Sequence, residues 1–189
     1  MTAVEIGIKL NKDLKYYDNV LKQNGFINDF NCETHDIYYT NKNLDNLTEN
    51  EMKKSCVRIR MVNEDKCSVQ NTSVFLELND VVFSENINEV EMVLKSKGFI
   101  KIFDTIKKDH HYGRNDIEGK IQLQEIKDLG LVVYYDNSKY YTLSEEEQWK
   151  KLIDELNLYG FDFKYEDYGI DKLRTLYYKK EMYSKNQNG

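Results

Sequence analysis

The sequence predicts an α+β fold in which amphipathic helices cover a large antiparallel sheet. Three observations support this prediction. The heptapeptide LKQNGFI at residues 21–27 reappears as LKSKGFI at residues 94–100, and each copy ends a helical pattern. Several segments carry β-branched or aromatic residues with the period of two that is typical of strands. The chain has 189 residues, of which 40% are hydrophobic and 13% aromatic, enough to bury a core without disulfides.

The three predicted helices are recognised by their ends. Asp13 precedes the first helix as an N-cap, and Ser144 with Glu147 forms a capping box for the third. Gly25 and Gly98 follow the last turns of the first two helices, where a left-handed C-cap is expected. The apolar positions at helical spacing are Leu14, Tyr17 and Leu21, then Ile87, Val90 and Leu94, then Trp149, Leu152, Ile153 and Leu156, with Gly160 after the third helix.

The strands are predicted around and between these helices. The predicted strands are Val4–Leu10, Asp36–Thr40, Cys56–Val62, Cys67–Leu78, Lys101–Tyr112, Lys120–Ile126 and Leu131–Asp136. Residues 63–65 and 115–116 are expected to form hairpin turns. The pattern predicts a single domain over residues 1–180 and a frayed polar tail at residues 181–189.

Charge and composition exclude several classes of protein. The net charge is −6 and no block of five lysines or arginines occurs, which argues against a general nucleic-acid or membrane-surface binder. The first apolar stretch contains Glu5 and Lys9, which argues against a signal peptide or a membrane span. Cys32, Cys56 and Cys67 form no CxxC motif, so reduced thiols and a cytoplasmic location are expected. The three histidines lack the spacing of a zinc site.

Arginine usage gives the sharpest indication of a binding site. Only four of the 27 basic residues are arginines, and two of them, Arg58 and Arg60, lie two residues apart in a predicted strand. The period of a strand places both guanidinium groups on one face. A guanidinium offers a planar fork that matches phosphate or carboxylate oxygens. The pattern predicts an anion site, with a solvated strand face or two structural ion pairs as the alternative.

The first strand also has a polar face. Glu5, Gly7 and Lys9 alternate with Val4, Ile6, Ile8 and Leu10. Because the apolar face of such a sheet is covered by helices, the charged face is expected to line a polar groove or a barrel lumen.

Several motifs, in order, resemble those of the CYTH superfamily, the triphosphate tunnel metalloenzymes, over roughly residues 3 to 178. The first strand, with Glu5, Gly7 and Lys9, is similar to the family's ExExK signature. The other motifs that carry the resemblance are D-I-Y-Y at residues 36–39, V-R-I-R at 57–60, I-K-K-D-H-H-Y at 106–112, I-Q-L-Q-E-I-K-D-L-G at 121–130 and G-L-V-V-Y-Y-D at 130–136.

The resemblance implies an eight-stranded antiparallel β-barrel tunnel with helices packed on its outside. It implies that Lys9, Arg58, Arg60 and Lys107 bind the phosphates of a small-molecule triphosphate and that Glu5 and Asp136 bind Mg²⁺ or Mn²⁺. The implied activity is a metal-dependent phosphohydrolase, as in thiamine triphosphatases, or a class IV adenylyl cyclase. No catalytic side chain is assigned, because phosphoryl transfer depends mainly on positioning and charge neutralisation. Family members are often dimers, so a homodimer is an open expectation.

The sequence departs from the family pattern at positions that matter for this chemistry. Gly7 replaces the second glutamate of ExExK, Asp109 replaces an arginine, Gln124 an aspartate and Tyr134 a glutamate. The T-x-K strand is weakly recognisable at residues 74–78. These substitutions lead to a second hypothesis, a binding module for a nucleotide, polyphosphate or partner that keeps the barrel without turnover.

Three further features have structural alternatives. The pair His110-His111 could act in acid–base chemistry or be an exposed pair at a strand end. Paired tyrosines could stack on a ring, although packing between sheet and helices explains most of the 15 tyrosines. Cys56 lies near the predicted site and is expected to be a structural thiol.

Overall fold

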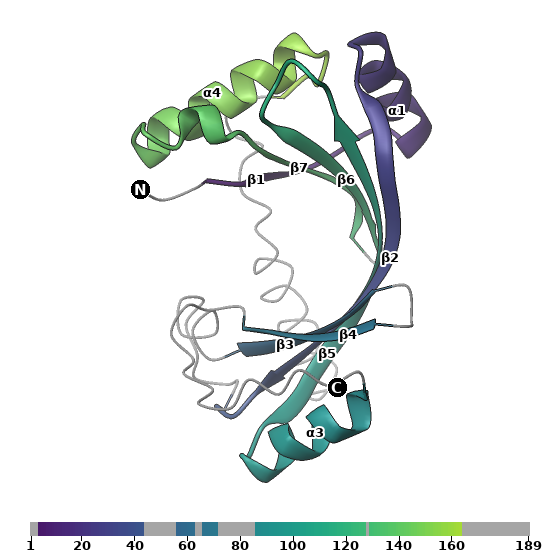
Figure 1. Ribbon diagram of the computed structural model, residues 1–189, viewed down its shortest axis with the longest axis vertical. Coiled ribbons are helices and arrows are strands. Elements are labelled where there is room, and N and C mark those ends of the chain that lie inside the picture. The colour runs from purple at the N-terminus through teal and green to yellow at the C-terminus, as the bar shows by residue number, and fades with distance from the viewer. Residues whose placement is uncertain (1–3, 44–55, 63–65, 72–85, 128, 164–189) are drawn as a thin grey trace, which may run out of the picture. The chain divides into compact units, whose positions relative to one another are not determined.

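The computed structural model confirms a mixed α+β fold with a large antiparallel sheet (Figure 1). It describes residues 4–43, 56–62, 66–71, 86–127 and 129–163. The strands are β1 (Ile6–Lys9), β2 (Ile27–Thr40), β3 (Cys56–Val62), β4 (Lys66–Asn71), β5 (Ile100–Gly113), β6 (Lys120–Ile126) and β7 (Gly130–Asp136). The helices are α1 (Leu14–Gln23), α3 (Ile87–Ser96) and α4 (Glu145–Leu158), with a 3₁₀ turn at Ser138–Tyr140.

The strand order corrects the expectation of a closed eight-stranded barrel. Within the described residues the sheet has seven strands in the order β1-β7-β6-β5-β2-β3-β4, so β1 and β4 are its two edges. In a closed barrel these edge strands would be joined to each other, directly or through further strands. The T-x-K segment at residues 74–78 and the predicted tail at residues 181–189 lie outside the described residues.

The described residues group into two compact units, and each is considered by itself. Unit 1 comprises the described residues of 1–32 and 108–172, and unit 2 those of 33–107. The boundaries fall inside β2, after Cys32, and inside β5, after Lys107. The prediction of one domain over residues 1–180 stays a prediction.

The helices end as the repeated heptapeptide predicts. At the end of α1 the Phe26 amide donates to the Leu21 carbonyl and the Gly25 amide to the Lys22 carbonyl, both at 3.0 Å. Gly25 has φ +79°, the left-handed conformation this ending requires, and Gly98 after α3 has the same value. This is the Schellman motif, in which the apolar residue after the glycine packs on the last turn. The recurrence of L-K-x-x-G-F-I therefore encodes one helix ending used twice.

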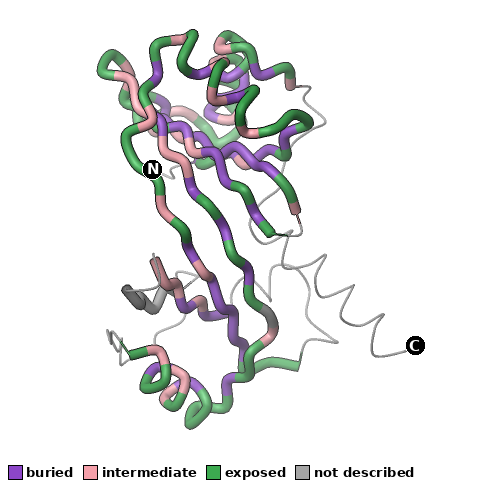
Figure 2. Tube along the Cα trace, turned by 90° about the vertical axis from the view of Figure 1, so that its right-hand side faces the viewer, coloured by how far each residue is buried: buried purple, intermediate pink, exposed green. Residues whose placement is uncertain are grey.

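Unit 1 has its core on one face of its strands. Apolar side chains of β1, β6 and β7 pack against α1 and α4, with Leu21, Leu152 and Leu156 fully buried or nearly so. The capping box at Ser144 and Glu147 starts α4 as predicted. Buried residues follow the strands and one side of each helix (Figure 2). The opposite face of these strands carries Gly7, Lys9, Gln122 and Gln124.

Unit 2 has a smaller core between α3 and strands β2 and β3. It contains Ile37, Tyr39, Val57, Ile59, Val90, Leu94 and Phe99. Because side chains alternate along a strand, burying Ile37 and Ile59 on α3 directs Asp36, Arg58 and Arg60 to the other face. None of the described helices is long and apolar enough to span a bilayer.

Candidate functional site

Unit 2 gathers three basic side chains around one carboxylate, which we call the Asp36 cluster. Arg60 on β3 lies directly opposite Asp36 on β2, and Arg58 lies opposite Tyr38. Lys107 comes from β5, which is the neighbour of β2 on its other side. Three adjacent strands thus each contribute side chains to one face of the sheet.

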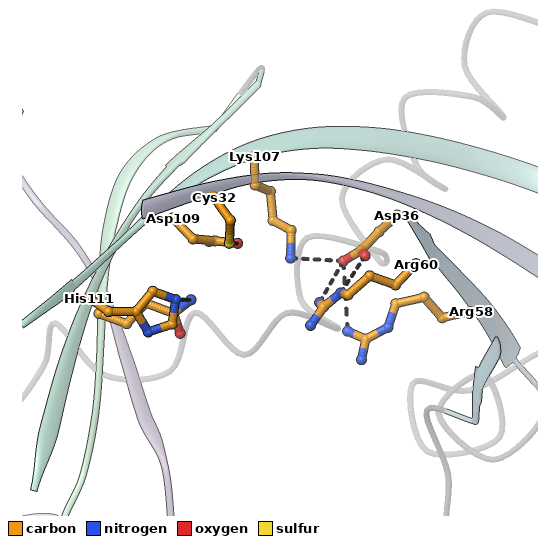
Figure 3. Close-up of polar contacts among 8 residues, drawn as sticks. Cys32, Asp36, Arg58, Arg60, Lys107, Asp109 and His111 are labelled. Carbon is orange, nitrogen blue, oxygen red and sulfur yellow. Dashed lines mark hydrogen bonds and ion pairs between the residues drawn. The ribbon is translucent and has the colours of Figure 1, made fainter. Parts of the chain in front are cut away.

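The contacts of the cluster converge on the two oxygens of Asp36 (Figure 3). Arg60 donates from Nε to Oδ1 at 2.7 Å and from Nη2 to Oδ2 at 2.8 Å. Lys107 Nζ lies 2.8 Å from Oδ2, and Arg58 Nη1 lies 3.7 Å from the same oxygen. Arg60 is therefore held by a bidentate pair, Lys107 by a close ion pair and Arg58 by a longer one.

Burial strengthens the electrostatic interactions among these charges. The Asp36 side chain is fully buried and that of Lys107 is 3% exposed, while those of Arg58 and Arg60 are 14% and 19% exposed. Burial alone would raise the pKa of Asp36, but the hydrogen bonds from Arg60 and the charges of Lys107 and both arginines hold that pKa well below its ordinary value. Burial, together with the nearby Asp36 charge, raises the pKa of Tyr38 to about 12. Asp36 is therefore ionised and Tyr38 neutral at ordinary pH.

The Asp36 cluster has the chemistry of an anion site. Three cations approach its single carboxylate. Charges of one sign held together in a low-dielectric environment attract a counter-ion strongly. The partly exposed guanidinium groups of Arg58 and Arg60 offer planar donors that suit phosphate oxygens.

Unit 1 contains the remaining residues that the resemblance implicates. Glu5 and Lys9 are exposed at either end of β1, and Asp136 ends β7. Ile6 pairs with Tyr135 at one end of the antiparallel β1–β7 ladder. Glu5 precedes Ile6 and Asp136 follows Tyr135, so the two carboxylates lie at this same end. The Tyr141 hydroxyl donates to Asp136 Oδ2 at 2.8 Å. That hydrogen bond, followed by burial, raises the pKa of Tyr141.

Glu5 and Asp136 are the candidate ligands for a divalent metal. No described group of three or more histidine, cysteine, aspartate or glutamate side chains is arranged to hold an ion. Mg²⁺ is nevertheless often bound by one or two carboxylates together with water and substrate phosphates. Glu5 and Asp136 fit this second kind of site and not an all-protein cage. Gly7, which brings no oxygen ligand, pairs with the buried Tyr134 in the same ladder.

Asp109 and the two histidines that follow it lie in unit 1. Asp109 is buried, and the Cys32 thiol lies 3.9 Å from its Oδ2. His110 contacts Asn31 and Glu125 at 3.0 and 3.1 Å. Burial lowers the pKa of His111 despite the opposing charge of Asp109. Neither histidine is at a strand terminus, since β5 continues to Gly113.

The structure therefore brings together Arg58, Arg60 and Lys107 in unit 2. Separately, Glu5 and Asp136 lie at the same end of the β1–β7 ladder in unit 1. Lys9 is exposed on β1 in unit 1, where it pairs with Val132. Cys56 is a buried free thiol.

The sequence reasoning missed Asp36 as a member of the site. Glu5 and Asp136 are the acidic residues that the resemblance assigns to the site, whereas the residue at the centre of the basic cluster is Asp36. A signal was present, because Asp36 begins the D-I-Y-Y motif at residues 36–39 of a predicted strand. What the sequence lacks is the register that places Asp36 opposite Arg60.

Comparisons with known proteins give relatives in structure and none in sequence. No family model matches the chain, and no curated protein is similar to it in sequence. The PH1012 protein of Pyrococcus horikoshii OT3 superposes with a TM-score of 0.63 at 18% identity, covering 89% of this chain and 94% of that one. The PH1819 protein of the same organism has a TM-score of 0.62 at 16% identity, covering 94% and 99%.

A third structure carries a functional description. A Vibrio parahaemolyticus protein described as a "putative adenylate cyclase" superposes with a TM-score of 0.59 at 13% identity, covering 91% of this chain and 97% of that one. At these identities the likeness shows the fold alone. The chain shares its α+β fold with these three proteins over most of their lengths.

Proposed function

We propose that this chain is a CYTH-like protein that binds the phosphate groups of an organic or inorganic triphosphate through Arg58, Arg60 and Lys107. The observation that carries the proposal is the Asp36 cluster, in which three basic side chains of three adjacent strands surround one buried carboxylate. The ordered motif resemblance and the fold shared with the Vibrio protein support the same assignment. The resemblance adds Lys9 as a fourth phosphate ligand.

The cluster is suited to phosphate because of the chemistry of its cations. Arg58 and Arg60 carry planar guanidinium groups, which match phosphate oxygens better than a single ammonium group does. Both side chains are partly exposed, whereas the Asp36 carboxylate that they approach is fully buried.

The accompanying activity that we propose is metal-dependent hydrolysis or cyclisation of the triphosphate. Glu5 and Asp136 would hold Mg²⁺ or Mn²⁺, which when bound supplies charge neutralisation at the phosphate oxygens. The role of the chain's basic residues is to bind and orient the phosphates. A cytoplasmic location, which the cysteine usage of the sequence favours, is part of the proposal.

A specific observation favours a second candidate, a binding module that does not turn its ligand over. Gly7 and Tyr134 face each other in the β1–β7 ladder, at two positions where the resemblance would place glutamates. Two adjacent carboxylates are therefore replaced by a hydrogen atom and a buried phenol. Such a module would bind through the Asp36 cluster without needing a metal.

Ligand-dependent thermal stabilisation tests the binding proposal. Tripolyphosphate should raise the melting temperature of the wild-type protein, and Arg58→Ala should abolish that shift. Lys101→Ala is the matched control, because it removes one exposed positive charge of the same unit outside the cluster. An equal shift in wild type and Arg58→Ala would remove the phosphate site from this cluster.

Phosphorus NMR separates the two candidates. The protein is incubated with ATP and, separately, with tripolyphosphate, each with magnesium and then with manganese. Release of orthophosphate identifies a phosphohydrolase, and pyrophosphate with a cyclic nucleotide identifies a cyclase. Intact substrate, together with binding that is unaffected by EDTA, identifies the binding module.

A further inference from the structure

We infer that Asp36 is a positioning residue of the phosphate site: its buried carboxylate holds Arg60, Lys107 and Arg58 in place to receive an anion. The inference rests on the proposed function, because it concerns how the same site is built. Asp36 is negatively charged, as the proposed phosphate ligand is, although the rest of the site attracts anions.

The contacts assign this role to Asp36. Both of its oxygens are used, Oδ1 by Arg60 Nε and Oδ2 by Arg60 Nη2 and Lys107 Nζ. The two hydrogen bonds to Arg60 fix the plane of that guanidinium, since a bidentate pair allows little rotation. Arg60 and Lys107 come from different strands, β3 and β5, so one carboxylate on β2 links both neighbours.

Because the cluster is buried, its cations need the Asp36 carboxylate as a partner. Asp36 is fully buried and Lys107 is nearly so. Three cations at close range in a medium of low dielectric repel one another, and a buried charge without a partner is unfavourable. The carboxylate offsets part of this repulsion.

Replacement of Asp36 by asparagine distinguishes positioning from simple electrostatics by the sign of its effect. Asp36→Asn raises the charge of the cluster by one unit, so electrostatics alone would tighten the binding of an anion. If the carboxylate positions the cations, binding weakens in spite of the added charge. The added positive charge would tighten anion binding, whereas loss of the carboxylate that positions the cations would weaken it.

The experiment is a calorimetric titration of tripolyphosphate into the full chain at fixed ionic strength, once in EDTA and once with magnesium. We expect Asp36→Asn to weaken binding by about tenfold or more, as expected for the loss of charge-assisted hydrogen bonds. The matched control is Asp104→Asn, which adds the same charge in the same unit at a half-exposed carboxylate paired with His35 and Lys101. It should change affinity by less than about twofold, because exposed charges are screened.

A double-mutant cycle shows whether Asp36 acts through Arg60. Arg60→Lys keeps the charge and removes the planar fork. If Asp36 works by fixing that fork, the double variant Asp36→Asn, Arg60→Lys binds no more weakly than the weaker single variant. Independent losses that multiply in the double variant would contradict positioning through Arg60. A purely structural role would lower the melting temperature of the free protein without producing this coupling in ligand affinity.

The outcomes separate this inference from the proposal beneath it. Absence of tripolyphosphate binding by the wild type, both in EDTA and with magnesium, would overturn the proposed function itself. Binding by the wild type, with equal or tighter binding by Asp36→Asn, would overturn the positioning role alone. If Asp36→Asn does not fold, Arg60→Lys alone decides, because wild-type affinity in that variant would show that the fork held by Asp36 is not needed.

Discussion

Arg60 and Asp36 face each other across strands β3 and β2 and are joined by two hydrogen bonds of 2.7 and 2.8 Å. The pair lies on the face of the unit 2 strands opposite the core under α3. Because Lys107 and Arg58 approach the same carboxylate, this pair is the centre of the proposed phosphate site. Its properties lead to predictions for both stability and binding.

Removing Arg60 should destabilise the protein even without a ligand. Arg60→Ala leaves the fully buried Asp36 without its bidentate partner, and breaking a buried pair costs about 3–5 kcal/mol. Lys95→Ala is the control, since Lys95 is 67% exposed and lies 3.6 Å from Glu91. It should change the free energy of unfolding by less than about 1 kcal/mol. Urea unfolding of both variants measures the difference, and equal stabilities would show that the Arg60 pair contributes little.

The pH dependence of stability should carry a contribution from Asp36. Its folded-state pKa lies well below that of the unfolded chain, because Arg60, Lys107 and Arg58 favour the ionised form. The stabilisation is therefore fully present above about pH 4, the range of an unperturbed aspartate, and is lost as the pH falls further. Urea unfolding as a function of pH should show a steeper acid loss in the wild type than in Asp36→Asn. Identical slopes below pH about 4 would contradict the lowered pKa.

The helix endings predict a measurable cost for a side chain at Gly98. Gly98 has φ +79°, and no heavy atom lies within 4 Å of the position of an added Cβ. Gly98→Ala should therefore cost only the left-handed backbone strain, about 1–2 kcal/mol. Gly98→Asn should cost less, because asparagine tolerates this conformation better. Chemical unfolding compares the two, and a Gly98→Ala variant as stable as the wild type would exclude the Schellman ending.

A carboxylate in unit 1 should influence the pKa values of two buried tyrosines. Glu155 on α4 accepts hydrogen bonds from the hydroxyls of Tyr135 and Tyr140, both at 2.5 Å. Burial raises the pKa of both tyrosines, and these hydrogen bonds raise it further. Glu155→Gln should lower both pKa values, which ultraviolet titration of tyrosinate measures. Glu146→Gln, at an exposed position of the same helix, should leave the titration unchanged. Equal curves for the two variants would contradict this arrangement.

The sequence predicted the local features of the fold well because local chemistry determines them. The cap at Asp13, the capping box at Ser144 and the glycines after the helices each act within a few residues of chain. The strands with regular alternation, β3 and β6, have the predicted bounds. Strand β2 begins at Ile27 and not at the predicted Asp36. The sequence did not predict this longer strand because residues 28–33 are mostly polar and exposed and carry no alternating pattern.

The candidate site could be predicted only in part. The period of a strand correctly places Arg58 and Arg60 on one face, since that inference needs no partner strand. The position of Lys107 beside them depends on β5 lying next to β2, which sequence spacing does not determine. Asp36 was missed because its role depends on strand register. The closed eight-stranded barrel came from the resemblance, and the described strands form an open sheet of seven.

The most direct test of the central claim is the observation of the arginine side chains themselves during ligand binding. The chain has only four arginines, so their Nε–H signals can be assigned in a nitrogen–proton NMR spectrum. Arg114 is an internal control, because its Nε already donates to Asp116 at 2.6 Å. The account predicts that tripolyphosphate, added with magnesium, shifts the signals of Arg58 and Arg60 and leaves that of Arg114 in place. Unchanged Arg58 and Arg60 signals at saturating tripolyphosphate would contradict it.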